Sequence, residues 1–509
     1  MAVQEKKTRK ISILSIALVL LGNILLFLTI WLLQKYDNIY LDQCLFQIKT
    51  SSSGVNHALA GSAVLRVGGL SILTTVLEVV LYQFLSGNLK EKFQRNRRYI
   101  EYCTTAVCDF FRKRALPISL AVFVFCTSFF AIQLNVFAYF GTTSTESDFI
   151  EDHYVDPGTV QLTFPAEKRN LIYIFLESME NTYADTSAGD PIYDNYIPEL
   201  TVLADENVSF SNTDALGGAY SYAGTTWTAS AMVAQTTGMT VKVPVTADAY
   251  GADAGFMPGV ISIGDILRRE GYNLRLLVGS DAAFHGRESY FLEHGNYDIV
   301  DIDSLKAEGR LPEDYLEWWG FEDEKLFAFA KEEIVALAEE GKPFNFTMLT
   351  ADTHFPDGYV CHLCETKYED QYSNVLSCSS KQVYDFVDWI KAQPFYENTT
   401  IIISGDHLTM DADFLDKLDK NYVRTTYNCI INAPVSPSLE KNREFGTFDM
   451  FPTTLAAMGV KIDGDRLALG TNLFSDKKTL TEIYGFEALD NELQKNSVFY
   501  NTKFLAMEE

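Results

Sequence analysis

Positive charge is scarce over most of this sequence. The 509 residues contain 41 Lys and Arg against 68 Asp and Glu, which gives a net charge of −27. After residue 140 the imbalance is steeper, with 26 basic residues against 61 acidic ones. A surface of this sign repels phosphate backbones, which argues against nucleic acid as a partner. It still permits an anionic lipid headgroup, because a metal and a few local cations can set the field inside a cleft.

Internal repeats and low-complexity segments are also lacking, so a repeat architecture is not expected. The length suffices for one large domain plus a membrane anchor. We predict an anchor over residues 1–140, a polar linker over 141–168 and an α/β domain over 169–509.

Three long apolar stretches lie in the first 140 residues, at residues 11–33, 67–85 and 115–140. The first is too long for a signal peptide, and no cleavage site of small residues follows it. Each stretch has about the length needed to cross a bilayer as a helix. We therefore expect three membrane spans.

The orientation of these spans follows from the basic residues. Lys and Arg gather before the first span and between the second and third, whereas residues 34–67 contain few. Because basic loops stay in the cytoplasm, the first span leads out of the cytoplasm, the second leads back in and the third leads out again. The N-terminus is then cytoplasmic, and everything after about Gly141 lies outside the cytoplasm of a bacterial cell membrane.

Three cysteines lie close together in the outward part of the chain, at Cys361, Cys364 and Cys378. Three thiols without a second Cys-x-x-Cys pair make a poor zinc site. In an oxidising compartment we expect a disulfide between Cys378 and either Cys361 or Cys364.

Short apolar runs alternate with helical patterns after residue 169. The runs that predict buried parallel strands are Asn170–Leu176, Leu274–Val278, Phe344–Leu349, Thr400–Ile403 and Tyr427–Ile431. The helical patterns include Ile261–Glu270, Glu324–Glu340 and Lys381–Ala392. This alternation favours a mainly parallel sheet covered by helices, in which ligands bind outside the carboxyl ends of the strands.

Carboxylates and imidazoles follow three of these predicted strands. Glu177 follows the first, His354 lies just beyond the third, and Asp406 and His407 follow the fourth. Strand carboxyl ends meet at one edge of a parallel sheet, so these side chains are expected to converge. Carboxylate oxygens with an imidazole suit a divalent cation such as Mn²⁺, Mg²⁺ or Zn²⁺.

A hydroxyl-rich segment, Ser221-Tyr-Ala-Gly-Thr-Thr-Trp-Thr228, precedes a predicted helix at residues 229–234. A hydroxyl at a helix N-terminus lies where free N–H groups favour a phosphate, and a metal would activate it as a nucleophile. The same threonines could instead merely cap the helix.

Four motifs of this chain resemble those of the phosphoglycerol transferase I family. This family is grouped with lipoteichoic acid synthases and phosphoethanolamine transferases in the alkaline phosphatase/sulfatase superfamily. The motifs are Asn170-Leu-Ile-Tyr-Ile-Phe-Leu-Glu177-Ser, Gly224-Thr-Thr-Trp-Thr228, Asp352-Thr-His354-Phe-Pro-Asp-Gly and Ser404-Gly-Asp406-His407-Leu-Thr-Met. They occur in the family's order, and the similarity covers roughly residues 170–473.

The resemblance implies a metal centre and a nucleophile. The family's metal ligands fall on Glu177, Asp406 and His407, with Mn²⁺ as the expected ion. The nucleophile, which also contacts the metal, falls on Thr225 because the family hydroxyl follows a pair containing glycine, and Thr226 is its rival.

The resemblance also implies a substrate pocket. His354 matches a substrate-binding histidine, and Arg287 matches the arginine with which lipoteichoic acid synthases bind the headgroup. His285 falls where those enzymes carry a tryptophan, so the pocket is expected to differ in shape. The nearby Asp281 could accept hydrogen bonds from hydroxyls or pair with an amine.

The reaction implied is a double displacement. The nucleophile would take phosphoglycerol from phosphatidylglycerol and pass it to a glycan of the cell envelope. A phosphoethanolamine transferase or a lipoteichoic acid synthase-like enzyme is the alternative, although three spans instead of their usual five disfavour it. A catalytically silent receptor is disfavoured because the site residues are intact, and a sulfatase because the Cys-x-Pro-x-Arg signature is absent.

Overall fold

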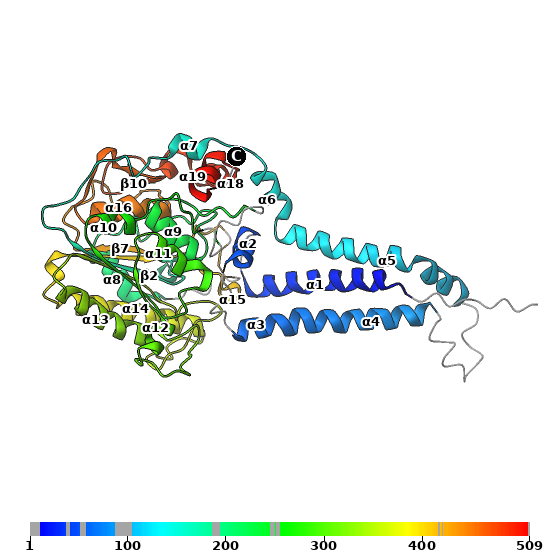
Figure 1. Cartoon of the computed structure of the whole chain (residues 1–509). Helices are drawn as coiled ribbons and strands as arrows, with labels where there is room; N and C mark the ends of the chain where they lie inside the picture. The colour runs from blue at the N-terminus through cyan, green and yellow to red at the C-terminus, as the bar shows by residue number, and fades with distance from the viewer. Residues whose placement is uncertain are drawn as a thin grey trace, which may run out of the picture. The chain divides into compact units, whose positions relative to one another are not determined.

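The protein is described by a computed structural model that divides into two compact units (Figure 1). One comprises residues 1–41 and 56–139, and the other comprises residues 42–55 and 140–509. The residues whose structure is described are 11–36, 41–50, 57–86, 104–185, 194–244, 250, 255–415, 418–419 and 421–506.

The first unit is helical. Its helices are α1 (Ile13–Lys35), α3 (His57–Ala63), a π-helical turn (Val64–Gly69), α4 (Leu70–Leu85) and α5 (Thr104–Gln133). Helix α1 packs beside both α4 and α5 (Figure 1). Within the described residues three helices are long and apolar enough to cross a membrane, at Ile13–Lys35, Ala60–Leu85 and Lys113–Gln133. The predicted third span ends early, because the chain turns at Asn135 before the short helix α6 (Val136–Thr143).

The second unit is built on a mainly parallel sheet. Its strands are β2 (Asn170–Leu176), β3 (Asn273–Val278), β4 (Asp298–Val300), β5 (Phe344–Leu349), β6 (Thr399–Gly405) and β7 (Asn428–Ile431). The order of these six described strands is β4-β3-β5-β2-β6-β7. Every residue of β2, β5 and β6 is buried, as expected for parallel strands covered on both faces.

The mainly parallel sheet is confirmed, but the prediction that the run Tyr427–Ile431 is a parallel strand is wrong, because β7 pairs antiparallel with β6. A parallel return to the same sheet needs a crossover of a dozen or more residues, usually a helix. The described part of the connection from β6 to β7 contains only the four-residue helix α15 (Ala412–Leu415), so the chain turns back instead.

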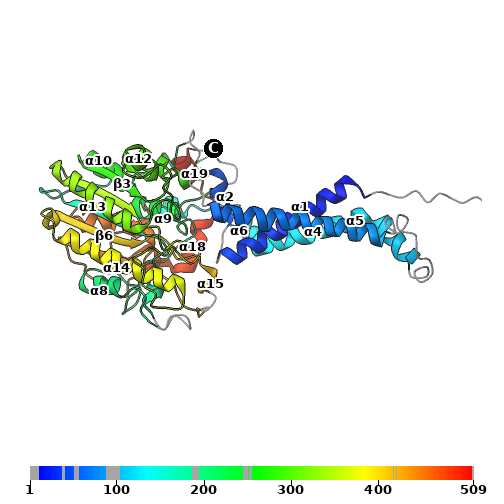
Figure 2. The same ribbon diagram turned by 90° about the horizontal axis from the view of Figure 1, so that it is seen from below.

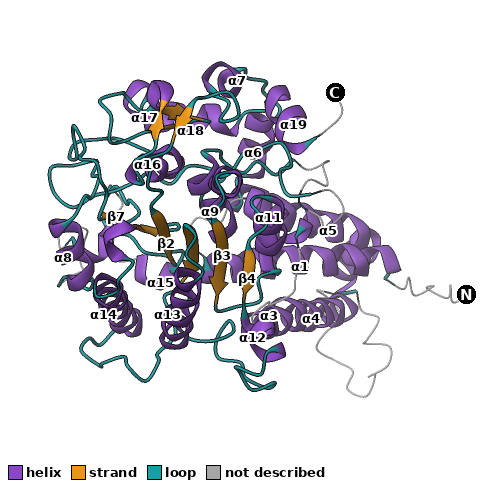
Figure 3. Cartoon of the chain, turned by 60° about the vertical axis from the view of Figure 1, so that its left-hand side comes forward, coloured by secondary structure: helices purple, strands orange, loops and turns teal. Residues whose placement is uncertain are grey.

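Helices cover both faces of the sheet (Figure 2, Figure 3). On one face, α8 (Pro198–Glu206), α13 (Asp323–Glu339) and α14 (Gln371–Lys391) share a hydrophobic core with Ile172, Ile174 and Leu176 of β2. On the other face lie α9 (Thr228–Thr237), α10 (Ile263–Arg269) and α16 (Met450–Ala457). There the Tyr173 hydroxyl of β2 donates to Gln235 of α9 at 2.8 Å. This packing fixes the N-terminus of α9 near the sheet edge.

The remaining elements surround this core. They are α2 (Leu41–Lys49), α7 (Phe149–His153), β1 (Leu162–Thr163), α11 (Arg287–Glu293), α12 (Ile302–Ala307), β8 (Lys461–Ile462), β9 (Arg466–Leu467), β10 (Gly470–Thr471), α17 (Leu480–Tyr484), α18 (Phe486–Gln494) and α19 (Val498–Leu505). The segment predicted as a polar linker contains α7 and β1, and β1 pairs with β8. This segment is therefore folded into the second unit, and so are residues 42–50.

Candidate active site

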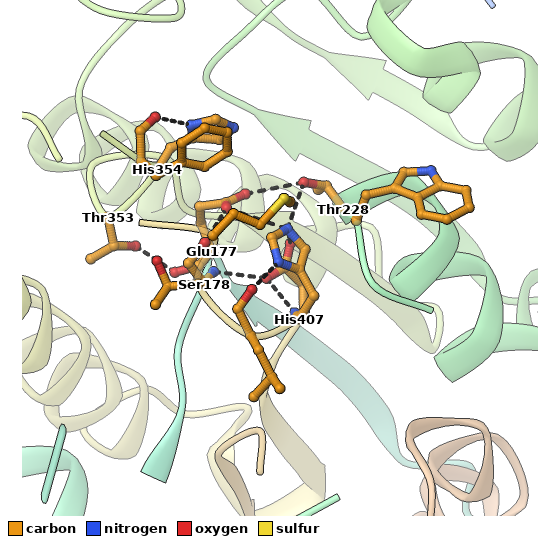
Figure 4. A network of polar contacts seen from close by, with 12 residues as sticks. Glu177, Ser178, Thr228, Thr353, His354 and His407 are labelled. Carbon is orange, nitrogen blue, oxygen red and sulfur yellow. Dashed lines mark hydrogen bonds and ion pairs between the residues drawn. The ribbon is translucent and has the colours of Figure 1, made fainter. Parts of the chain in front are cut away.

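Three predicted metal ligands meet at one edge of the sheet. Glu177 directly follows β2, and Asp406 and His407 directly follow its neighbour β6. The two strands pair in parallel with Leu176 opposite Gly405, so their ends coincide. The ligand atoms of the three side chains lie within 4.8 Å of one another, and all three residues are buried (Figure 4). The sheet register thus assembles this cluster.

The cluster has the features of a divalent-metal site. The Nδ1–H of His407 donates to the Leu408 carbonyl at 2.8 Å, which leaves the lone pair of Nε2 for a metal. Nε2 lies 3.5 Å from Glu177 Oε1 and 3.4 Å from Asp406 Oδ2. Among the described residues, the buried Asp406 Oδ2 has no hydrogen-bond partner. A cation bound between these atoms would satisfy that oxygen.

The electrostatics of the cluster also favour a cation. Burial raises the pKa of Asp406 to about 7, and the neighbouring charge of Glu177 adds to the shift. Burial opposes ionisation of Glu177 too, but His354, His407 and nearby hydroxyls together hold its pKa below the ordinary value. Two buried carboxylates in contact repel each other when both are ionised. A divalent cation would offset that repulsion.

Hydroxyl side chains that the sequence analysis missed hold the carboxylates in place. The Ser178 hydroxyl donates to Glu177 Oε1 at 2.7 Å, and its backbone N–H donates to Asp406 Oδ1 at 2.8 Å. Thr350 accepts the Glu177 N–H, and Thr353 donates to the Glu177 carbonyl. Ser178 and Thr353 are drawn in Figure 4. In the sequence, the signal for Ser178 was its place directly after Glu177, at the end of a predicted strand.

Thr228 also brings a hydroxyl to this cluster. Its Oγ1 donates to Glu177 Oε2 at 3.2 Å and lies 3.3 Å from His407 Nε2 (Figure 4). Thr228 is the first residue of α9 and is half-buried, so a substrate can approach it. The first N–H groups of this ten-residue helix have no carbonyl partner in the preceding turn, which favours an anion there.

Thr225, the predicted nucleophile and metal contact, makes no hydrogen bond to the cluster within the described structure, so its role stays a prediction. The fully buried Thr225 hydroxyl accepts from the Tyr222 N–H and donates to the Tyr222 carbonyl, both at 2.9 Å. These bonds close a turn that contains Gly224 at φ +76°. The hydroxyl of the rival Thr226 is buried without a hydrogen-bond partner among the described residues. The turn before α9 thus uses the Thr225 hydroxyl.

His354 lies beside the cluster rather than in it (Figure 4). Its Nδ1–H donates to the Phe355 carbonyl at 2.6 Å, and its ring lies 4.7 Å from that of Trp319. Burial lowers the pKa of His354 despite the opposing charge of Glu177, so the ring is neutral at pH 7. Its Nε2 is therefore a proton acceptor. Trp319, from the loop before α13, is a wall of the site that the sequence did not suggest.

Arg287 is a buried cation without an ion pair in the described part of the chain. Its guanidinium donates to the Ser280 hydroxyl, the Asp281 carbonyl and the Phe284 carbonyl, at 2.9, 2.9 and 3.1 Å. The residue is 5% exposed, and burial lowers its pKa to about 10, which leaves it charged at neutral pH. Nearby Glu177 favours the charge. A buried guanidinium held by neutral acceptors suits an anionic ligand.

His285 and Asp281 occupy the same loop as Arg287. His285 has φ +56°, and its ring stacks on that of Phe284 at 3.9 Å. Burial, with the charge of Arg287, lowers the pKa of His285 to about 3, so its ring is neutral. Asp281 accepts the Ala283 N–H at 2.8 Å, and its carboxylate lies within 4.8 Å of those of Asp301 and Asp303.

The three clustered cysteines converge as the sequence suggests but are not bonded. The sulfur of Cys361 lies 3.6 Å from that of Cys364 and 3.7 Å from that of Cys378. The Cys361 sulfur thus lies close to those of both Cys364 and Cys378. The disulfide of Cys378 stays a prediction.

A Glu-Asp-His cluster at parallel strand ends, with a hydroxyl at a helix N-terminus, suits an enzyme that acts on an ester through a divalent cation. The profile of the sulfatase family matches residues 169–460, more than half of the chain. The chain belongs to the sulfatase family. The fold agrees with a solved structure from Vibrio parahaemolyticus, a protein in the alkaline phosphatase superfamily. That structure is 22% identical and has a TM-score of 0.50, and the match covers 66% of this chain and 79% of the other.

Two similar curated proteins are named phosphoglycerol transferase I. The chain is 32% identical over 342 residues to phosphoglycerol transferase I of Salmonella choleraesuis, covering 65% of this chain and 42% of that protein. It is 34% identical over 278 residues to phosphoglycerol transferase I of Salmonella paratyphi B, covering 53% of this chain and 35% of that protein. The chain therefore spans less than half the length of these relatives.

Proposed function

We propose that the protein is a metal-dependent transferase that moves phosphoglycerol from phosphatidylglycerol to a glycan of the cell envelope. The observation that carries this proposal is the Thr228 hydroxyl, which contacts Glu177 and lies beside His407 at the start of α9. A nucleophile in this position, with the unpaired charge of Arg287 nearby, suits transfer of a phosphate ester. The similarity to phosphoglycerol transferases supports glycerol as the headgroup.

Glu177, Asp406 and His407 would hold the metal, with Thr228 at its side. A divalent cation, for which we propose Mn²⁺ with Mg²⁺ or Zn²⁺ as alternatives, supplies positive charge that activates the hydroxyl and balances the phosphate. Ser178 keeps both carboxylates oriented through its hydroxyl and its N–H. The hydrogen bond from His407 to Leu408 fixes the ring so that Nε2 faces the carboxylates.

In the first half of the reaction, Thr228 Oγ1 forms a bond to phosphorus. The bond from phosphorus to the diacylglycerol oxygen breaks, and phosphoglycerol stays on the threonine. His354, neutral because burial lowers its pKa, accepts the threonine proton at Nε2 and returns it to the departing oxygen. Free N–H groups at the start of α9 and the guanidinium of Arg287 stabilise the phosphate charge.

In the second half, a hydroxyl of the acceptor glycan attacks the same phosphorus. Its bond to phosphorus forms as the bond to Thr228 Oγ1 breaks, and the acceptor proton passes to the threonine oxygen. An anchor of three spans would hold the domain beside its lipid donor and raise the effective concentration.

Donor choice tests this proposal. With Mn²⁺, the purified full chain is expected to release diacylglycerol from phosphatidylglycerol and largely to ignore phosphatidylethanolamine, as measured by mass spectrometry. Arg287→Ala should lower kcat/KM, with a loss of transition-state stabilisation on the order of 2–5 kcal/mol, because a buried charge-assisted contact is lost. Arg268→Ala, which removes an exposed arginine of α10, is the matched control and should change nothing.

The possible outcomes separate the alternatives. A preference for phosphatidylethanolamine would support a phosphoethanolamine transferase. Polymerised glycerol phosphate as the product would support a lipoteichoic acid synthase-like enzyme. If no phospholipid is cleaved, the silent receptor is the better reading.

A further prediction concerns membrane topology. A reporter that is active only outside the cytoplasm should be active when fused after Thr143 and inactive when fused near Asn96, which lies outside the described residues. The basic residues between the second and third spans are the reason. Residues 42–50 follow the first span and fold with residues after 140. This shared unit supports a location of both segments on the same side of the membrane. The opposite reporter pattern would refute the extracytoplasmic location.

A further inference from the structure

Helix α2 belongs to the enzyme domain although it lies far from that domain in sequence. It occupies the chain between the first two candidate spans, yet residues 42–50 fold with residues 140–509. Phe46 of α2 is 1% exposed. The rings that surround it, with their centroid distances, are Trp227 at 5.2 Å, Tyr250 at 5.2 Å, His285 at 6.0 Å and Phe256 at 6.1 Å. Burial in such an aromatic cage anchors the helix to this unit.

The contacts of α2 fall on the three loops that carry the candidate site. Gln43 Nε2 lies 3.3 Å from the sulfur of Met410, three residues after His407. Phe46 packs on Trp227, which directly precedes Thr228. The His285 Nε2–H donates to the side-chain oxygen of Gln47, and His285 lies two residues before Arg287. One short helix therefore joins the metal-ligand, nucleophile and arginine loops.

The exposed Gln47 is the polar group that α2 presents beside the arginine loop. Arg287 supplies a charge for a phosphate but cannot distinguish one attached alcohol from another. The Gln47 amide offers both donors and an acceptor, and the His285 ring beside it is neutral. Such neutral partners suit hydroxyl groups, whereas an ammonium group prefers carboxylates or aromatic faces.

We propose that α2 forms a wall of the donor headgroup pocket and that Gln47 binds the headgroup's hydroxyl groups. This inference rests on the proposed function, because it specifies the alcohol attached to the transferred phosphate. It makes the segment between the first two spans a specificity element of the enzyme. Gln47 acts in binding and takes no part in the bond changes at phosphorus.

Calorimetry on the Mn²⁺-loaded full chain in detergent tests this role, with glycerol phosphate and inorganic phosphate as the probes. Gln47→Ala should weaken glycerol phosphate binding about tenfold, the effect of one or two lost hydrogen bonds, and leave inorganic phosphate binding unchanged. Ile48→Ala is the matched control, because Ile48 directly follows Gln47 in α2 and its side chain is 79% exposed. It should leave both affinities unchanged.

Phe46→Ala provides a second, independent variant. Loss of the aromatic anchor should release α2 and weaken glycerol phosphate binding by at least as much as Gln47→Ala, again without affecting inorganic phosphate. Equal losses for both probes, or no loss for glycerol phosphate in Gln47→Ala, would overturn the role of α2, as would a parent protein that fails to bind glycerol phosphate. Failure of the proposed function looks different: the parent would bind glycerol phosphate through Gln47 yet leave phosphatidylglycerol intact.

Discussion

Thr228→Ala is expected to abolish transfer and to leave no covalent intermediate. The variant lacks the hydroxyl that contacts Glu177 and lies beside His407, and no other hydroxyl is bonded to Glu177 Oε2 within the described structure. Loss of a nucleophile costs on the order of 10⁴-fold or more in kcat. Release of diacylglycerol measures the rate, and mass spectrometry of the quenched enzyme detects phosphoglycerol on the peptide containing Thr228. Thr228→Ser should keep a measurable rate because it keeps the hydroxyl.

The neighbouring threonines provide the controls. Thr225→Ala leaves the buried Tyr222 N–H without its acceptor, so it should lower the free energy of unfolding by about 1–3 kcal/mol while kcat stays near that of the parent. Thr226→Ala removes a hydroxyl that has no partner among the described residues, and it should be close to neutral. A folded Thr225→Ala that is inactive, together with an active Thr228→Ala, would return the nucleophile to Thr225.

The strands were predictable where burial made the sequence signal strong. The bounds of β2 and β5 match the predicted runs, because every residue of these two strands is buried and most of their side chains are apolar. Strand β4 was missed because it has three residues, of which one is buried. The direction of β7 was not readable from its own residues, since a short apolar run looks the same in either direction. The connection between β6 and β7 was the informative feature, because its described part contains no helix long enough for a parallel crossover.

The convergence of Glu177, Asp406 and His407 was predictable because a strand end is a position in both sequence and space. Glu177 and Asp406 follow adjacent strands, and the register then brings them together. Thr225 lies just before α9 and Thr228 is its first residue, and spacing alone does not tell a hydroxyl that closes a turn from one that begins the helix. Gln47 and His285 are 238 residues apart, so their contact had no local signal at all. Sequence patterns located the cluster, and tertiary packing determined which hydroxyl lies beside it.

Metal removal is expected to stop the reaction and to destabilise the second unit. The ligands come from two strand ends, so a bound cation links β2 and β6 and offsets the repulsion of two buried carboxylates. Binding at a hundredfold excess over Kd stabilises the folded state by about 2.7 kcal/mol. Excess chelator should therefore lower Tm by roughly 5–10 °C, and added Mn²⁺ or Mg²⁺ should restore both Tm and diacylglycerol release.

Variants of the ligands separate metal binding from unspecific effects of the chelator. Asp406→Asn removes one of the two buried charges, so its Tm should no longer respond to chelator or to Mn²⁺, and its activity should be lost. Asp413→Asn removes an exposed carboxylate of α15 and should respond to both reagents as the parent does. Because a charge at the Asp406 position is costly without a cation, the metal-free Asp406→Asn protein should be at least as stable as the metal-free parent. A parent protein whose Tm and activity are unchanged in excess chelator would contradict the metal site, and an Asp406→Asn protein that still gains stability from Mn²⁺ would place the ion elsewhere.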